Sequence, residues 1–159
     1  ISCEGEIGFV GYQNGEHSKG TDPEEARIFA LNTRVDALAI SCGNVHLQEQ
    51  QEGSLDLNRI RMIEAFTSLP LVIHGGSGIP RQQRENLSKN TKICKFNIGT
   101  ELRMVFGHAL REAINQDEKR FDRIEIMNET INPIYDATIK VLQSFGGPDK
   151  LNPNETNKV

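Results

Sequence analysis

Short apolar runs alternate along the chain with longer segments that carry apolar residues at helical spacing. The runs that predict strands span residues 1–8, 37–41, 69–73 and 92–98. The amphipathic segments predict helices over 22–32, 56–67, 80 onward, 100–115 and 121–144. Four strand–helix units followed by a terminal helix indicate an α/β fold, in which a parallel sheet is covered by helices.

The start of the first helix is specified by its own residues. Asp22 can serve as the N-cap, Pro23 suits the first helical position, and Glu24 and Glu25 place negative charge in the first turn. The glycine-rich segment 9–20 before it predicts a loop, as does the polar segment 48–54.

The chain length of 159 residues leaves two architectures open. A closed (β/α)₈ barrel takes about 250 residues, so four units fit either a doubly wound open sheet or half of a barrel. The sequence opens at Ile1, inside a predicted strand, which suggests that a preceding part is missing. We expect one domain over 1–145 and a flexible tail over 146–159, where Pro, Asn and Lys are frequent.

Composition narrows the class of protein. The net charge is −4 and the basic residues are scattered, so neither nucleic acid nor an anionic membrane is an expected partner. No apolar run approaches the roughly 20 residues that span a bilayer. Cys3, Cys42 and Cys94 form no CxxC pair, which predicts reduced, partly buried thiols in a cytoplasmic protein.

Polar residues follow each predicted strand, at the edge where parallel α/β folds bind ligands. His46 and His74 end neighbouring strands, which favours a shared metal over two isolated hydrogen-bonded histidines. A catalytic zinc ion takes three protein ligands and keeps an open position. The third ligand would be Glu4, Glu6 or a residue outside this chain; the two glutamates lie two apart and therefore face one side of their strand.

Glycine-rich turns follow the third and fourth strands. The segment from His74 through Gly75, Gly76, Ser77 and Gly78 precedes a predicted helix, and backbone amides in such a turn can bind an anion. A second turn repeats the arrangement at Asn97, Ile98, Gly99 and Thr100. One such turn alone is often only a tight corner, but two adjacent turns with hydroxyl groups predict a phosphate site between them.

The glycine-rich loop 9–20 also holds Glu16 and His17. Either both are surface residues, or the loop carries a mobile acid/base residue.

Together these segments resemble a known family. EGEIG at 4–8, TDPEEA at 21–26, VDALA at 35–39, GNVH at 43–46, PLVIHGGSGIP at 70–80 and NIGTEL at 97–102 follow the order and spacing of the class II aldolases. These enzymes cleave fructose bisphosphate, tagatose bisphosphate and related ketose phosphates. The resemblance covers about residues 1 to 111 and is specific as a set.

The resemblance implies a TIM barrel, of which this chain holds strands five to eight. It implies that His46 and His74 bind zinc and that Glu6 lies near the metal. It implies that Glu16, in the loop that matches a mobile catalytic loop, moves protons. The phosphate of dihydroxyacetone phosphate would bind at Gly75, Gly76, Ser77, Asn97, Ile98, Gly99 and Thr100. A monovalent cation is also implied, although Leu47 stands where the family usually has a glycine that approaches it.

The family's third zinc histidine and its catalytic aspartate lie in an N-terminal half that this chain lacks. We therefore expect this chain to be a fragment or a split-gene product that is active only together with a complementing N-terminal half. The expected role of the complete enzyme is in carbohydrate metabolism of the glycolytic type. The alternatives are a non-catalytic phosphate-binding remnant of the barrel and a metal-free phosphosugar isomerase or epimerase. A half barrel would expose two sheet edges and an apolar interior face, which predicts self-association into a homo-oligomer.

Overall fold

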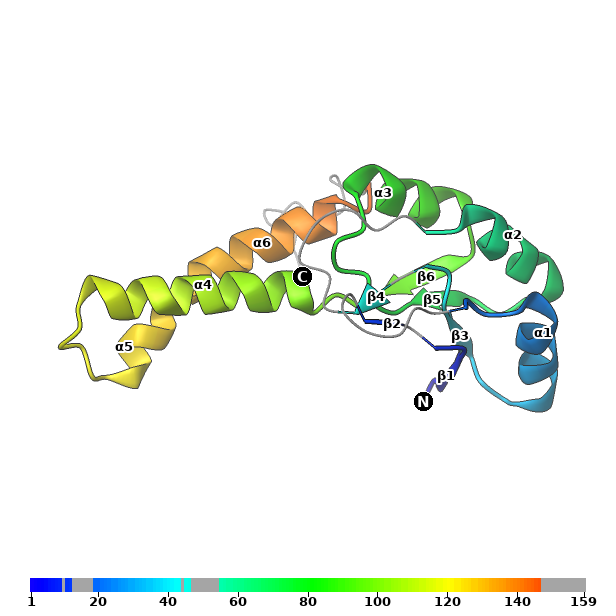
Figure 1. Ribbon diagram of the computed structural model, residues 1–159, viewed down its shortest axis with the longest axis horizontal. Coiled ribbons are helices and arrows are strands. Elements are labelled where there is room, and N and C mark those ends of the chain that lie inside the picture. Colours follow the sequence, from blue (N-terminus) through cyan, green and yellow to red (C-terminus); the bar gives the residue numbers. More distant parts are fainter. Residues whose placement is uncertain (10, 13–18, 44, 47–54, 147–159) are drawn as a thin grey trace, which may run out of the picture. The chain divides into compact units, whose positions relative to one another are not determined.

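The structure is a computed structural model (Figure 1) in two units, residues 1–101 and residues 102–159. It describes residues 1–9, 11–12, 19–43, 45–46 and 55–146. The first unit holds the predicted sheet and its helices. The expected tail 146–159 and the expected loop 48–54 fall outside the described residues, except for Gly146.

The sheet of the first unit has four parallel strands in the order β1-β3-β5-β6. These are β1 (Glu4–Ile7), β3 (Ala37–Ile40), β5 (Leu71–Ile73) and β6 (Ile93–Phe96). Between them run α1 (Pro23–Asn32), α2 (Leu57–Phe66) and α3 (Arg81–Asn90).

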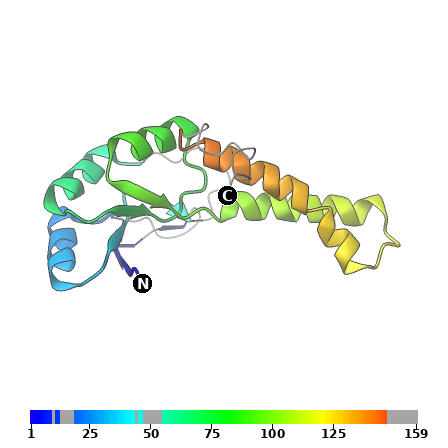
Figure 2. The ribbon, with the colours of Figure 1, turned by 180° about the vertical axis from the view of Figure 1, so that it is seen from behind.

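The three helices lie on one face of the sheet, as both views show (Figures 1 and 2). The strand order follows the chain without reversal. A doubly wound sheet would place helices on both faces and would reverse its strand order at one point. The fold is therefore that of half of a (β/α)₈ barrel, which decides between the two architectures that the sequence left open.

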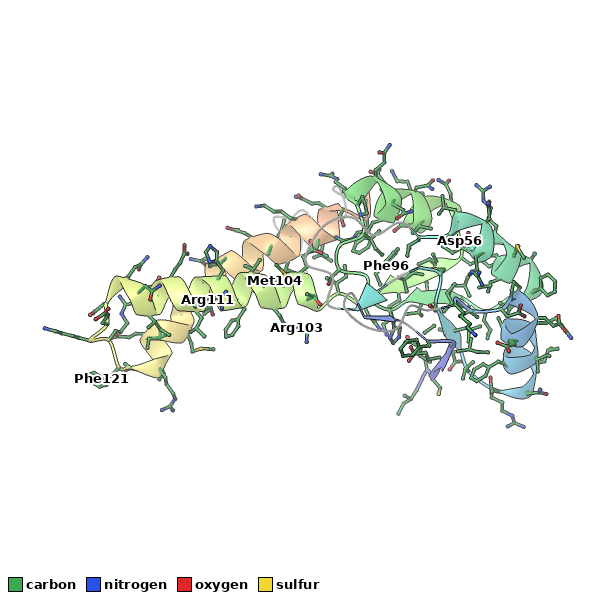
Figure 3. The ribbon with its side chains drawn as sticks, in the orientation of Figure 1. Asp56, Phe96, Arg103, Met104, Arg111 and Phe121 are labelled. Atoms are coloured by element: carbon green, nitrogen blue, oxygen red, sulfur yellow. The ribbon has the colours of Figure 1, made fainter. Side chains whose placement is uncertain are left out.

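The predicted signal for the first helix is confirmed at the level of hydrogen bonds. The Asp22 carboxylate accepts from the backbone amides of Glu24 at 2.9 Å and Glu25 at 3.1 Å. Asp56 accepts in the same way from the amide of Arg59 at 2.9 Å and begins α2 (Figure 3). Each cap supplies an acceptor to amides that have no partner within the helix.

The apolar core lies between the sheet and the helices. Because paired residues of neighbouring strands share a face, the register of Leu38 with Leu71 and of Ile40 with Ile73 makes one buried surface. The helices bury Ala26, Ile60, Ile63 and Leu87 against it.

The opposite face of the sheet carries charge. Register aligns Glu6 with Ala39, Ala39 with Val72, and Val72 with Lys95, so these four side chains face away from the core. Glu6 and Lys95 are exposed, whereas Ala39 and Val72 are buried. The expectation of an exposed apolar interior face is thus wrong for the described residues, because this face is lined by carboxylate and amine side chains.

A second, two-stranded sheet was not predicted. It pairs β2 (Gly11–Tyr12) with β4 (Val45–His46) in parallel. It continues the pairing of β1 with β3 beyond Gly8 and Gly43, which have φ angles of 90° and 94°. Only glycine adopts such angles at little cost, so both strands bend at a residue suited to bending.

Thr21 ties the ends of β1 and β3 together at this bend. Its buried hydroxyl donates to the carbonyl of Ile7 at 2.8 Å and accepts from the amide of Ser41 at 2.9 Å. A Cβ at Gly8 would lie 2.6 Å from the same hydroxyl oxygen, so a side chain there is excluded by space as well as by φ.

The second unit is helical. The chain runs along α4 (Thr100–Gln116), which begins at the end of the first unit, and continues through α5 (Arg123–Asn128) and α6 (Ile131–Gln143). The prediction of a single last helix over 121–144 is wrong, because α5 and α6 are separate helices. Pro133 has no amide hydrogen to donate to the carbonyl of Glu129, and its ring clashes with a helical carbonyl four residues earlier, so the helix breaks between α5 and α6.

Several large apolar side chains of the second unit are exposed. Phe121, in the segment between α4 and α5, is the most exposed of them at 94% and points outward (Figure 3). The others are Met104, Ile114, Ile124, Met127, Ile131, Tyr135 and Leu142. No helix among the described residues is both long and apolar enough to cross a membrane.

The three cysteines are free, and they differ in reactivity. Cys42 is fully buried, whereas Cys3 and Cys94 are exposed, so the structure has none of the three thiols in the partly buried state that the sequence predicts. Burial, with a smaller contribution from Asp56, raises the pKa of the Cys42 thiol to about 12.

We expect Cys3 and Cys94 to react rapidly with a thiol reagent at neutral pH, and Cys42 only on unfolding, because the thiolate is the reactive form. Rapid labelling of all three in the native chain would contradict this.

Candidate functional site

A cluster of charged and titratable side chains occupies the sheet face opposite the helices, at the end of β5. His74 Nε2 lies 3.0 Å from Glu4 Oε1, and His74 Nδ1 lies 3.8 Å from Glu6 Oε1. Lys95 Nζ donates to the second Glu4 oxygen at 2.7 Å. The His74 and Glu4 side chains are partly buried, at 22% and 26% exposed. Strands β1 and β6 and the end of β5 thus bring four side chains from separate parts of the sequence together.

The Glu4 carboxylate is the centre of this cluster. Hydrogen bonds with Lys95, and then with His74, hold the pKa of the Glu4 carboxyl below its ordinary value, against the opposing effect of burial. Glu4 is therefore a carboxylate at neutral pH and accepts from both neighbours. The prediction that Glu4 and Glu6 share one side of their strand is confirmed, since both reach His74.

The contact with Glu4 orients the His74 ring in a way that suits a metal ligand. A hydrogen bond to Glu4 favours the tautomer with the proton on Nε2, which leaves the lone pair on Nδ1. Metal-bound histidines commonly donate their other ring nitrogen to a carboxylate in this manner. Among the described residues, no group of three or more His, Cys, Asp or Glu side chains could hold a metal ion. With its Nε2 held by Glu4, the His74 ring fits the role of one ligand of a metal ion.

The structure describes the other predicted ligand only by its backbone. His46 pairs with Tyr12 across the small sheet. Glu16, His17 and Leu47 lie outside the described residues. The predicted roles of His46 and Glu16 therefore stay predictions.

The two glycine-rich turns lie against each other, as predicted. The Gly76 amide donates to the Asn97 carbonyl at 2.9 Å, and the Asn97 amide donates to the carbonyl of Ile73 at 2.8 Å. Gly75 and Gly78 have φ angles of 60° and 79°, which favour glycine at both positions. The turn after β5 is thereby fixed beside the turn after β6.

Ser77 joins the same two turns through its side chain. Its hydroxyl, 3% exposed, accepts from the amides of Gly99 and Glu101, each at 3.2 Å. The Ser77 oxygen therefore occupies an acceptor position at the start of α4, where a phosphate oxygen would also be stabilised by the helix dipole. The amides of Gly76, Asn97 and Gly99 already have acceptors in this arrangement.

Two residues of this region were not predicted from the sequence. Lys95 lies within a strand that reads as apolar, and only its register places it beside Glu4. Arg84 lies in a polar helix yet is 2% exposed. A basic residue six positions after Gly78 was the available signal for Arg84.

The described residues thus form half of a (β/α)₈ barrel, with a histidine–carboxylate cluster and paired glycine turns at the carboxyl ends of its strands. A model of the family "Fructose-bisphosphate aldolase class-II" matches residues 1–150. The chain belongs to this family.

Similar proteins agree with this assignment. A 6-phospho-5-dehydro-2-deoxy-D-gluconate aldolase from Shouchella clausii (strain KSM-K16) is 35% identical over 153 residues, covering 94% of this chain and 52% of that protein. The crystal structure of the YdjI aldolase from Escherichia coli K12 has a TM-score of 0.68 and 27% identity, over 94% of this chain and 50% of that one. A putative fructose-1,6-biphosphate aldolase from Coccidioides immitis has a TM-score of 0.73 at 21% identity, over 94% and 54%. The chain spans about half the length of these relatives.

Proposed function

We propose that this chain forms the zinc- and phosphate-binding part of an aldolase that cleaves a ketose bisphosphate of the fructose or tagatose type. The products would be dihydroxyacetone phosphate and an aldehyde. One observation carries the proposal: His74, held by Glu4, immediately precedes the turn that lies against the Asn97–Thr100 segment. A metal on His74 and a phosphate on the turns would therefore hold two ends of one small substrate.

The proposed roles follow from the chemistry of each group. His74 and His46 would hold zinc, with Glu4 fixing the His74 ring. Bound zinc supplies a Lewis acid for the substrate carbonyl. Glu6 and Glu16 are proposed to move protons.

The phosphate is proposed to bind between the two glycine-rich turns. Gly75, Gly76 and Ser77 would contribute from the first turn, and the residues from Asn97 to Thr100, with a monovalent cation nearby, from the second. Anchoring the phosphate would orient the reacting carbon relative to the metal.

The substrate is proposed to be a phosphorylated sugar or a phosphorylated derivative of one. The name of the Shouchella clausii relative points to a phosphorylated sugar acid rather than a bisphosphate. Both kinds of substrate carry a phosphate group, which is the feature that the paired turns suit. The free thiols support a reducing, cytoplasmic setting.

A second candidate function is a non-catalytic phosphate-binding remnant that acts through its turns alone. This alternative needs only the paired turns, which lie against each other through the hydrogen bond from the Gly76 amide to the Asn97 carbonyl. It differs from the aldolase proposal in one measurable respect, since it binds phosphate but neither zinc nor a ketose carbonyl.

The test combines metal and activity measurements. Zinc content and cleavage of fructose bisphosphate, tagatose bisphosphate and 6-phospho-5-dehydro-2-deoxy-D-gluconate are measured for the chain alone and with the N-terminal half of a family member. Stoichiometric zinc and cleavage on mixing are expected. Phosphate binding without zinc or cleavage under either condition would replace the aldolase proposal with the remnant.

A further inference from the structure

Arg84 is the one charged side chain among the buried residues of the described part of the chain. It lies in α3 and is 2% exposed. Burying a guanidinium group costs several kcal/mol unless hydrogen bonds and an opposite charge compensate it.

The partners of Arg84 belong to the two glycine-rich turns. Its Nη2 donates to the carbonyl of Gly76 at 3.0 Å and to Glu101 Oε2 at 2.6 Å. Gly76 lies in the turn after β5, and Glu101 lies in the first turn of α4, directly after the second glycine-rich turn. One guanidinium nitrogen thus connects both turns.

The bond from Arg84 to Gly76 also fixes the direction of the next amide. A trans peptide unit is planar, and its N–H points opposite to its carbonyl. The carbonyl of Gly76 points at the buried guanidinium, so the N–H of Ser77 points away from Arg84. This orientation turns the Ser77 amide away from Arg84, so that an anion bound at the turn could accept a hydrogen bond from it.

We propose that Arg84 is a positioning residue for the substrate phosphate, and this rests on the proposed phosphate site. Arg84 holds the Gly76–Ser77 peptide in the orientation that presents the Ser77 amide, and through Glu101 it fixes the spacing of the two turns. It does so without touching the phosphate, because its side chain is buried and its charge is neutralised by Glu101.

The test measures inorganic phosphate binding to the full chain by titration calorimetry, together with the ¹⁵N–¹H spectrum of the Ser77 amide. Arg84→Met is expected to weaken phosphate binding about tenfold, the equivalent of one charged hydrogen bond. The phosphate-dependent shift of the Ser77 amide should be lost with it. Arg84→Lys keeps the charge and one nitrogen that can donate to both acceptors but lacks the planar guanidinium group, so it should lose less. Arg61→Met, an exposed arginine of α2, is the control and should bind as the wild type does.

The outcomes separate this inference from the proposed function. If the wild-type chain binds no phosphate, the phosphate site and the role of Arg84 are both overturned. If the wild type binds phosphate and folded Arg84→Met binds it equally well, only the role of Arg84 is overturned. If Arg84→Met fails to fold, Arg84→Lys decides: weaker binding with a smaller Ser77 shift supports the role, and unchanged binding overturns it.

Discussion

Replacing His74 with alanine is expected to abolish stoichiometric zinc binding and, with it, aldol cleavage. His74 supplies an imidazole whose ring is oriented by Glu4 at 3.0 Å. Removing a residue that hydrogen-bonds to a metal ligand typically weakens metal affinity about 10–100-fold. Removing the ligand itself should therefore weaken zinc binding by more than about 100-fold. Zinc affinity by competition with a chelating dye is the direct measurement, and cleavage with the complementing half is the second.

His108→Ala is the matched control for this prediction. His108 lies on α4 with its side chain 73% exposed and its Nε2 only 3.6 Å from Glu112. Its loss should leave zinc affinity unchanged. Equal zinc affinity of the wild type and His74→Ala would remove His74 from the metal site.

Leu38→Ala is expected to lower the free energy of unfolding by about 2–5 kcal/mol. Leu38 is fully buried in β3, a central strand that pairs with both β1 and β5, and its side chain belongs to the core beneath the helices. Truncation removes apolar contacts and leaves a cavity that the surrounding strands can only partly fill. Since domains of this size are stable by about 5–15 kcal/mol, the effect is a large part of the total.

Urea unfolding provides the measurement, with the midpoint and slope compared between variants. Leu31→Ala is the control, because Leu31 is 70% exposed on α1 and its truncation should change stability by no more than about 0.5 kcal/mol. A smaller loss for Leu38→Ala than for Leu31→Ala would mean that the core does not lie between the sheet and α1–α3.

Local signals in the sequence predicted the strand–helix order because they act within a few residues. Asp22 and Pro23 specify a helix start by capping and by a fixed φ, and the structure has α1 beginning at Pro23. The paired glycine turns were predicted for a similar reason, since each follows a buried strand. The choice between an open sheet and a half barrel depends on which face the helices cover, and no local signal specifies that.

Lys95 was missed because its orientation depends on an irregularity in β6. Simple alternation would place Ile93 and Lys95 on the same face. The register instead pairs Ile93 with Leu71 and Lys95 with Val72, which are neighbours on β5, so one extra residue reverses the alternation. A bulge of this kind turns Lys95 toward Glu4, and its position is set by pairing with another strand rather than by the residues of β6.

Arg84 was missed for a different reason. Its helix, RQQRENLSKN, is so polar that a solvent-exposed face is the natural interpretation of each charge. The burial of Arg84 depends on acceptors supplied by Gly76 and Glu101, which are 8 and 17 residues away. Long side chains that reach across a turn to such partners cannot be recognised from the spacing of apolar residues.

The two faces of the sheet separate stability from chemistry, which bears on how such a protein can diversify. Most of the apolar core lies on the helix side, whereas Glu4, Glu6 and Lys95 lie on the other. Substitution at these three positions removes no side chain from the helix-side core. Variants can therefore accumulate there without unfolding the chain. The family is named for fructose bisphosphate, whereas one relative is named for 6-phospho-5-dehydro-2-deoxy-D-gluconate, so the same helix-side core is compatible with different names of substrate.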